Sequence, residues 1–382
     1  MTKPSQPKDV EGSPGMADPV VVTDPRKTPV RTAPLAENQR GAWYDGPDVI
    51  TCLRELDSPL EFDLPREVPR FTIGASRSCD IALPGRGLSA THVLLERRAD
   101  KLRLIDQNTT NGTYFQDRKI DDVKLSPGDT FTLAPVTFLA MNDEMRAHRP
   151  TIIDVVGSSS TPSPDKLLIE AARGSGNLLL TGEPNCDQDR LARALHAVSL
   201  RRRRPLVEIS EVPEERAKQR AIIDQAARST LVLSIAPGQR SFDPTFVSMV
   251  CSPSYYVRLL VLASSIDAAR AALTRDAVDQ MQHVWVRPLA LRSDDIDRLL
   301  DRLFAERGAS VRCADLAPGN LAALRAYDWP DNLVGLRLIA DELVAHAAHQ
   351  GLRPAAKALG ISKSTLQKHF DRIGLSIPLF AS

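Results

Sequence analysis

The sequence has no long hydrophobic run and no excess of charge of either sign. No apolar stretch reaches the roughly 20 residues that a membrane-spanning helix needs. The first residues, Met1-Thr-Lys-Pro-Ser, lack the apolar segment of a signal peptide. Lysine and arginine (49) almost equal aspartate and glutamate (48), so the net charge is +1 and any contact with nucleic acid must be local. We therefore expect a cytoplasmic protein that does not interact with a membrane.

Cysteine is also scarce. The 5 cysteines of the 382 residues follow none of the spacings of metal sites, which indicates free thiols in a reducing compartment. His346 and His349 lie one helical turn apart, but no third ligand is nearby. We expect these two histidines to be solvated and the protein to have no metal site.

Short alternating apolar runs between residues 71 and 138 predict a small all-β sandwich. Turn pairs such as Asn111-Gly112 and Pro127-Gly128 separate them. The runs lie at residues 93–95, 102–105, 131–133 and 136–138.

Three motifs of this stretch resemble those of the forkhead-associated (FHA) domain, a phosphothreonine-binding module. They are Gly74, Ser89-x-x-His92 and Asn111-Gly112-Thr113, and the resemblance covers about residues 47–143. It implies that the hydroxyls of Ser89 and Thr110 bind the phosphate and that the Asn111 amide binds the peptide main chain. It also implies that His92 holds the Ser89 loop. Hydrogen bonds to a phosphate are strong because they are charge-assisted.

The usual cations of the FHA site are replaced in this chain. The family has arginine directly after the first glycine, where this sequence has Ala75, and often a basic residue after the serine, where it has Ala90. Arg77 and Arg86 lie in the two loops, and we assign the missing charge to Arg77. The expected partner is a phosphothreonine-containing protein, a Ser/Thr kinase or its substrate. The alternative is an FHA scaffold that binds an unphosphorylated partner.

The first 46 residues are rich in Pro, Lys, Asp, Thr and Ser and have almost no aromatic residues, so we expect a disordered tail. Thr23, Thr28 and Thr32 could be phosphorylated and bound by the FHA domain of the same or another copy. The alternative is a solvated tail without such a role.

Buried strands alternate with helices from residue 165 to residue 263, which predicts a parallel α/β sheet covered on both faces. Residues 144–164 are predicted to be a linker with a short apolar segment at 152–156. Strands are expected at 177–182, 205–209, 230–235 and 256–263, and helices at 165–173, 187–200 and 214–228.

This middle region resembles the ATPase domain of bacterial enhancer-binding proteins, the NtrC-like activators of sigma-54 RNA polymerase. The matching segments are 155–158, 178–183, 191–196, 287–296 and Tyr327-Asp-Trp-Pro-Asp-Asn332. The resemblance implies an AAA+-like domain at 165–335 with a helical lid from about residue 289.

The phosphate-binding loop of such an ATPase is altered here. It needs glycines, a lysine and a Ser or Thr around the nucleotide phosphates and magnesium. The corresponding loop at 182–189 has no lysine, Pro184 removes an N–H, and Asp187 and Asp189 are expected to repel phosphate.

Other parts of the motor are missing as well. The strand ending at Ser234-Ile235 lacks the acidic pair that holds magnesium, and Val334 stands where the sensor arginine is expected. Between Ile209 and Thr230 there is no room for the loop that engages the sigma factor. We expect no enzymatic activity, no cofactor and a role as a scaffold or assembly surface. The alternative is nucleotide binding without hydrolysis.

The last segment, 336–382, is predicted to be a helix-turn-helix. An amphipathic helix at 336–350 precedes a short helix at 352–359, and Ser362 is a good N-cap for a third helix at 363–372. The segment resembles the Fis-type DNA-binding domain that ends enhancer-binding proteins. In that family the first helix dimerises, so we expect a homodimer on double-stranded DNA.

Basic residues gather in this segment. From 352 to 375 there are five of them and one acidic residue, and five minus one gives a local charge of +4. Leu366 and Phe370 are expected in the core. The residues expected to contact DNA are Lys363, Ser364, Thr365, Gln367, Lys368, His369 and Arg372.

The chain is therefore expected to be multidomain, with an all-β FHA sandwich, an α/β AAA+-like domain with a helical lid, and an all-α helix-turn-helix. The function expected from this order is that of a DNA-binding transcriptional regulator that senses a phosphothreonine-bearing partner. The alternatives are an FHA interaction scaffold with little DNA binding and an ATP-dependent sigma-54 activator.

Overall fold

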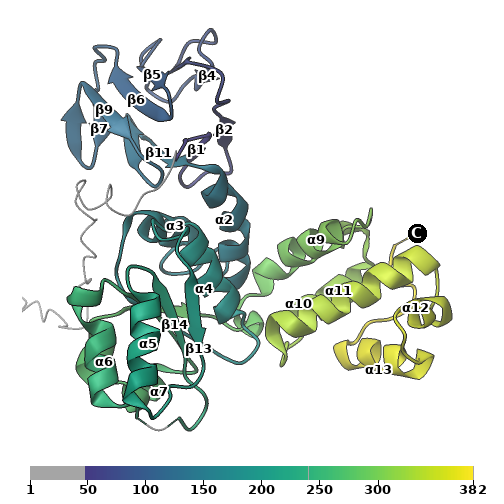
Figure 1. The fold of residues 1–382 in the computed structure, drawn as a ribbon. Coiled ribbons are helices and arrows are strands. Elements are labelled where there is room, and N and C mark those ends of the chain that lie inside the picture. Colours follow the sequence, from purple (N-terminus) through teal and green to yellow (C-terminus); the bar gives the residue numbers. More distant parts are fainter. Residues whose placement is uncertain (1–47, 240, 382) are drawn as a thin grey trace, which may run out of the picture. The chain divides into compact units, whose positions relative to one another are not determined.

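The computed structural model describes residues 48–239 and 241–381; the predicted disordered tail at 1–46, with Thr23, Thr28 and Thr32, lies outside them. The first described part is a sandwich of two β-sheets (Figure 1), with strand orders β2-β1-β11-β10-β7-β8 and β4-β3-β5-β6-β9. The strands are β1 (Cys52–Glu55), β2 (Glu61–Asp63), β3 (Arg70–Gly74), β4 (Ile81–Ala82), β5 (Val93–Arg98), β6 (Lys101–Asp106), β7 (Thr113–Phe115), β8 (Arg118–Ile120), β9 (Asp122–Leu125), β10 (Thr130–Leu133) and β11 (Val136–Met141).

In strands such as β3 and β10, buried side chains alternate with more exposed ones, as the sequence pattern indicated. In β10, Phe131 and Leu133 are buried whereas the two threonines are half-buried. The rings of Phe131 and Phe138 stack with centroids 5.4 Å apart across paired strands. Gly112 and Gly128 take positive φ at the predicted turns, a conformation that glycine adopts without strain. The predicted sandwich is confirmed.

A helix stands where the first half of a linker was predicted. α2 (Asp143–Val156) is capped by Asn142, whose side chain accepts a hydrogen bond from Met145 N. Acidic residues in the first turn stabilise the N-terminus of the helix. Pro150 lies inside the helix without ending it. The linker prediction for 144–164 is therefore wrong up to residue 156, because Met145 before Pro150 and the apolar residues 152, 155 and 156 after it are buried along the same helix.

The middle part is a five-stranded sheet in the order β13-β14-β15-β12-β16, and all its strand pairs are parallel, as predicted. Its strands are β12 (Leu178–Gly182), β13 (Leu206–Ile209), β14 (Thr230–Ser234), β15 (Arg258–Ala263) and β16 (Gln282–Val286). Its helices are α3 (Pro164–Arg173), α4 (Gln188–Ala197), α5 (Arg216–Ala226), α6 (Pro244–Cys251), η2 (Pro253–Tyr255), α7 (Ile266–Ala272) and α8 (Arg275–Asp279).

Both faces of this sheet are covered. Successive residues of β15 enter different cores: Leu259 and Val261 belong to one hydrophobic cluster, and Leu260 and Leu262 to the other. This arrangement explains why β15 is buried at every position and shows no alternation in its sequence. The edge strand β16 was not predicted.

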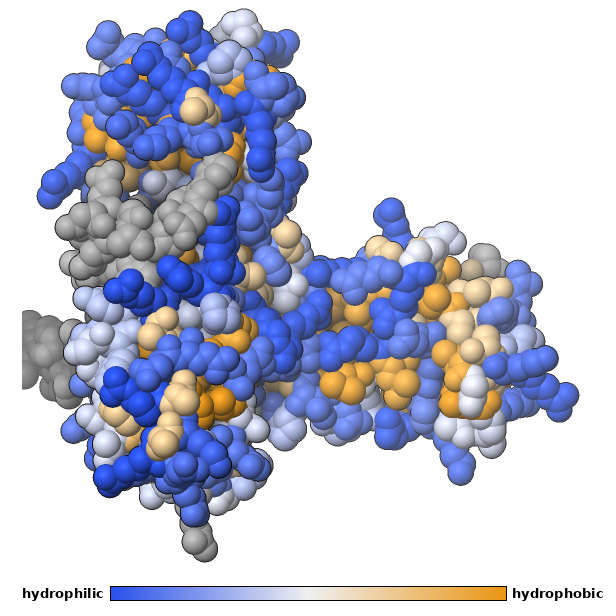
Figure 2. All heavy atoms as spheres, in the orientation of Figure 1, coloured by the Kyte–Doolittle hydropathy of each residue, from blue (hydrophilic) through white to orange (hydrophobic). Residues whose placement is uncertain are grey.

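The last part is helical. Its elements are η3 (Leu289–Leu291), η4 (Ser293–Asp295), α9 (Ile296–Glu306), η5 (Cys313–Asp315), α10 (Pro318–Ala326), α11 (Asn332–His349), α12 (Leu352–Ala358) and α13 (Lys363–Ile373). We call residues 289–349 the helical lid. α11 contacts α9 and also α12, so the domain boundary predicted between residues 335 and 336 falls inside one continuous helix (Figure 1). Figure 2 shows apolar side chains reaching the drawn face over α10 and α11.

His346 is buried, contrary to the prediction that it is solvated. Its ring contacts those of Phe370 and Phe380, with centroids 6.4 Å from each, because this face of α11 packs into the same core as α13. His349, one turn further on, is exposed as predicted.

The C-terminal segment folds back onto the lid. Leu316 and Phe380 form an isolated β-bridge, and Leu379 is buried. The buried Asn320 side chain donates to the carbonyls of Ser376, Pro378 and Leu379 and accepts from Ser376 N. The two C-terminal helices are thus fixed to the lid twice, through α11 and through this segment. Among the described residues, no helix combines the length and apolar character needed to cross a bilayer.

Candidate functional site

Two loops at one edge of the sandwich are joined by backbone hydrogen bonds. Ala75 N donates to Ser89 O at 2.9 Å, and Ser76 N donates to Ala90 O at 3.0 Å. A Cβ on Gly74 would lie 2.2 Å from Ala90 O. Only glycine allows this approach, so Gly74 brings the loop after β3 against the loop that carries Ser89.

His92 connects the Ser89 loop with a third loop. Its ring is fully buried, Nδ1 accepts from Ser89 N at 3.2 Å, and Nε2 lies 3.3 Å from Gly112 O. Because Nδ1 is the acceptor, Nε2 carries the proton and donates to Gly112 O. His92 therefore has the structural position that the sequence indicated.

Asp106 holds the loop of Thr110 and Asn111. It accepts from Thr109 N (2.9 Å), Thr109 Oγ1 (2.7 Å) and Thr113 Oγ1 (2.7 Å), and Gly112 N donates to Thr109 Oγ1. Burial by itself would raise the pKa of Asp106, but the hydrogen bonds from Thr109 and Thr113 outweigh it and the pKa lies below its ordinary value. Asp106 was not predicted from the sequence, although Asp side chains often stabilise turns by accepting from nearby backbone N–H groups.

The loop between β12 and α4 borders a cleft of about 500 Å³, which also includes the ends of β14 and β15 and Val334 of α11. The two aspartates that border this cleft both form ion pairs. Asp189 forms an ion pair with Arg193 at 2.8 Å, and Asp187 forms one with Arg337 of α11 at 2.5 Å. Val334 is uncharged and cannot replace the arginine expected at its position, but Arg337 lies about one helical turn further along α11. Arg337 was not predicted from the sequence, although its i, i+3 spacing from Val334 places it on the same side of the helix.

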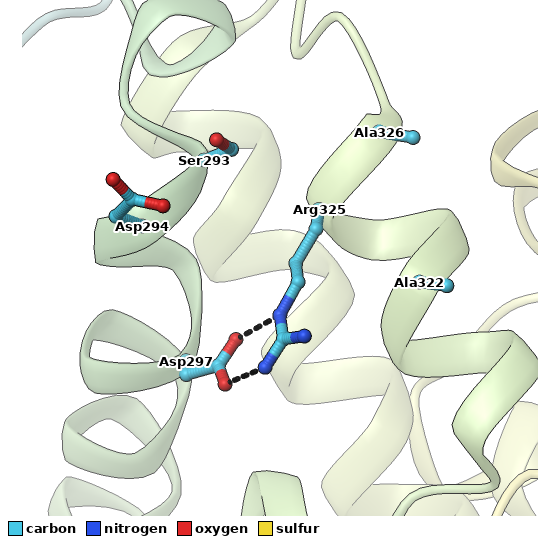
Figure 3. Close-up of a pocket in the computed structure, with 6 residues that line it drawn as sticks. All are labelled: Ser293, Asp294, Asp297, Ala322, Arg325 and Ala326. Carbon is cyan, nitrogen blue, oxygen red and sulfur yellow. Dashed lines mark hydrogen bonds and ion pairs between the residues drawn. The ribbon is translucent and has the colours of Figure 1, made fainter.

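A second cleft of about 590 Å³ lies within the lid, between the start of α9 and α10. Figure 3 shows Arg325 reaching across it to Asp297 with two hydrogen bonds. The positive charge of Arg325 is therefore paired within the lid. The other residues that line this cleft are Ser293, Asp294, Ala322 and Ala326. In the described part of the chain, no three His, Cys, Asp or Glu side chains gather as they would to bind a metal.

Helix α13 begins as predicted, with the Ser362 side chain accepting from Thr365 N. Leu366 and Phe370 are fully buried, which confirms them as core. Among the residues predicted to contact DNA, the exposed ones are Lys363, Ser364, Lys368 and Arg372.

The other three predicted DNA contacts are half-buried. Thr365 lies beside the cap, and Gln367 donates to Asp371 Oδ1 at 2.7 Å. His369 Nδ1 lies 2.5 Å from Glu342 Oε1 of α11, so only its Nε2 remains available to a ligand. The amphipathic pattern could not reveal this partner, because Glu342 is a carboxylate on the buried face of another helix.

The model of the FHA domain family matches residues 71–134, and no curated protein matches the sequence. The chain contains an FHA domain. Solved structures similar to it include the FHA domain of the CT664 protein from Chlamydia trachomatis (24% identity, covering 24% of this chain and 95% of that chain, TM-score 0.23). The Slr1951 protein from Synechocystis sp. is 27% identical over 24% of this chain and 93% of its own (TM-score 0.22). NtrX from Brucella abortus, solved with ATP, is 17% identical over 61% of this chain and 68% of its own (TM-score 0.39).

The polar side chains of the FHA-domain loops differ in exposure and in hydrogen bonding. Ser89 is half-buried and Thr110 exposed, and neither hydroxyl has a hydrogen-bond partner among residues 48–239 and 241–381. The Asn111 side chain donates to Gly87 O at 3.1 Å, so its amide bridges to the Ser89 loop. Both hydroxyls are therefore free to donate to a ligand.

Three cations of the FHA domain lie near these loops. Arg86 forms an ion pair with Glu55 at 2.8 Å, whereas Arg77 is exposed and has no ion-pair partner in the described chain. Lys119 of β8, which the sequence analysis missed, lies across the Asn111-Gly112 turn. A Cβ on Gly112 would be 2.5 Å from Lys119 Cε and 3.1 Å from its Nζ. Arg77 and Lys119 thus carry the unpaired positive charge beside the loops.

Proposed function

We propose that the FHA domain binds a phosphothreonine-containing segment of another protein, a Ser/Thr kinase or its substrate. The observation that supports this most is the pair of unpartnered hydroxyls of Ser89 and Thr110 on two loops that His92 fixes together. A phosphate on a flexible peptide needs donors held on rigid loops, because each donor then adds affinity without further ordering.

The experiment is peptide binding by the full chain. A library of peptides fixed only at a central phosphothreonine should bind, and Ser89→Ala should weaken that binding by about tenfold, as expected for a lost charge-assisted hydrogen bond. Thr91→Ala removes an exposed hydroxyl two residues further along the same loop and serves as the control. Equal affinity of wild type and Ser89→Ala would reject the assignment.

The two C-terminal helices form a helix-turn-helix in this proposal, and α13 enters the major groove of DNA as part of a homodimer. Support comes from the exposed Lys363, Lys368 and Arg372 on a helix whose other face is buried. Lys368→Glu replaces a phosphate-attracting charge with a repelling one. It should abolish the binding of duplex DNA in a gel-shift assay, and unchanged affinity would contradict the assigned face.

The middle domain is a non-catalytic AAA+-like core in this proposal, so the whole chain is a transcriptional regulator rather than an enzyme. Support comes from the loop at 182–189, where Pro184 and two paired aspartates stand in place of the groups that would bind a nucleotide phosphate. Two rivals remain: an FHA scaffold with little DNA binding, and an ATP-dependent sigma-54 activator. Tight binding of duplex DNA would exclude the scaffold. The absence of ATP turnover by the purified chain would exclude the sigma-54 activator.

A further inference from the structure

The loop before α4 is held to the helical lid by a two-point ion pair. Arg337 Nη1 donates to Asp187 Oδ2 at 2.5 Å, and Nη2 donates to Asp187 Oδ1 at 2.8 Å. The Asp187 side chain is 10% exposed and that of Arg337 32%. Hydrogen bonding to Asp187 raises the pKa of Arg337, so this guanidinium stays charged. Two parallel hydrogen bonds between an arginine and a carboxylate fix orientation as well as distance.

A second contact between the same loop and the same helix lies near the start of α11. The Asn332 side chain is almost fully buried, and its Nδ2 donates to Pro184 O at 3.1 Å and to Glu183 Oε2 at 3.3 Å. Its Oδ1 accepts from Leu289 N at 3.0 Å. One amide therefore joins the loop, the beginning of the lid and α11.

The position of Asp187 is one that usually receives a ligand. In open α/β sheets, anions bind at the carboxyl end of a strand where the next helix begins, because the helix N-terminus presents unpaired N–H groups. Asp187 lies there, between β12 and α4, with φ of 60° and no hydrogen bond from its side chain to the helix. Its carboxylate turns to Arg337 instead, at the border of the 500 Å³ cleft.

We propose that Asp187 and Arg337 form an intramolecular latch that keeps the lid on the sheet without any bound nucleotide. The Asp187 carboxylate occupies the position of an anionic ligand. Arg337, the lid arginine that such a ligand would attract, already forms an ion pair with Asp187. Because α11 continues from the latch to the C-terminal helices, the latch also fixes those helices relative to the sheet. This inference concerns lid closure and stands apart from the binding of phosphopeptide or DNA.

Hydrogen–deuterium exchange of the full chain tests the latch. Arg337→Asp places two carboxylates face to face and should speed exchange of the loop at 183–189 and the first turns of α11 by about tenfold, the factor expected for a lost charged hydrogen bond. The double variant Asp187→Arg with Arg337→Asp restores the pair in reverse and should recover slow exchange. Adding ATP with magnesium to the wild type should leave exchange in both segments unchanged.

Arg325→Asp is the matched control. It breaks another two-point arginine–carboxylate pair, with Asp297, but both partners belong to the lid (Figure 3). Exchange of the 183–189 loop should stay at the wild-type rate in this variant. If Arg337→Asp folds poorly, Arg337→Lys serves in its place. It keeps the positive charge but cannot form two parallel hydrogen bonds with Asp187, so the exchange rate of the loop should be intermediate. Wild-type exchange in both Arg337 variants, or marked slowing of the wild type by ATP, would overturn the latch.

Discussion

The buried ring of His92 accepts a hydrogen bond from the backbone N–H of Ser89, and its other nitrogen reaches Gly112 O. This buried side chain therefore joins the two loops that carry Ser89 and Thr110, and the Asn111 amide adds a second link through Gly87 O. The chemistry proposed for this edge of the sandwich depends on that spacing, because neither Ser89 nor Thr110 can fix the distance between the loops.

Replacing His92 should abolish phosphopeptide binding although every proposed ligand-binding group remains. In His92→Ala the Ser89 N–H and the Gly112 carbonyl lose their partner in a dry environment, which should cost about 1–3 kcal/mol of stability for each group left unsatisfied. Peptide titration of the full chain, with urea unfolding beside it, measures both effects. Wild-type affinity in His92→Ala would show that the loops are positioned by other contacts.

Lys119 and Arg77 should share the charge that Ala75 does not provide. The single variants Lys119→Ala and Arg77→Ala should each weaken phosphopeptide binding several-fold and reduce its dependence on salt, because exposed charges act through a screened field. Arg86→Ala is the control, since Arg86 is paired with Glu55. Fluorescence anisotropy at two salt concentrations measures the effect. If only Arg86→Ala weakens binding, our choice of cations is wrong.

The sequence indicated the sandwich, the parallel sheet and the C-terminal helices because each follows from local periodicity. The sequence did not predict α2, because Pro150 suggested a break in the helix. The residues buried on both sides of Pro150 show that packing against the rest of the protein stabilises the helix. The sequence also missed groups that act across long sequence distances. Lys119, Arg337 and Glu342 belong to ordinary strand or helix patterns. The turn that Lys119 lies across and the partners of Arg337 and Glu342 belong to other parts of the chain.

The C-terminal segment should separate from the lid when Asn320 is replaced. Asn320→Ala leaves the carbonyls of residues 376 and 378 without their donor and the Ser376 N–H without its acceptor, which should cost about 1–3 kcal/mol, whereas Leu379 O keeps its hydrogen bond from Ala317 N. Exchange of the amides at 376–381 should rise. Ser376→Ala, on the same segment, removes an exposed hydroxyl and should change nothing. Unaltered protection in Asn320→Ala would assign the docking to the Leu379 and Phe380 side chains and to the backbone hydrogen bonds of residues 379 and 381.

The stability of the C-terminal helices should fall on acidification. Burial lowers the pKa of His346 below its ordinary value, so the unfolded chain binds its proton first. The stabilisation from neutral His346 is complete above about pH 6.5 and is lost as the pH falls from there through the lowered pKa. His346→Phe cannot titrate and should lose less stability between about pH 7.5 and about pH 5.5.

Urea unfolding of wild type and His346→Phe at both pH values gives this comparison. Burial also lowers the pKa of His196 and of His283, and burial raises the pKa of Glu342, but these groups titrate in both proteins and cancel in the difference. Parallel pH profiles of the two proteins would contradict the role of His346.

The most direct test of the whole account compares two peptide libraries on the unaltered chain, one fixed at a central phosphothreonine and the other at threonine. Fluorescence anisotropy should show binding of the phosphorylated library at least about tenfold tighter, the difference that one charge-assisted contact provides. Equal affinity for the two libraries would contradict phosphothreonine recognition and leave the FHA domain as a scaffold for an unmodified partner.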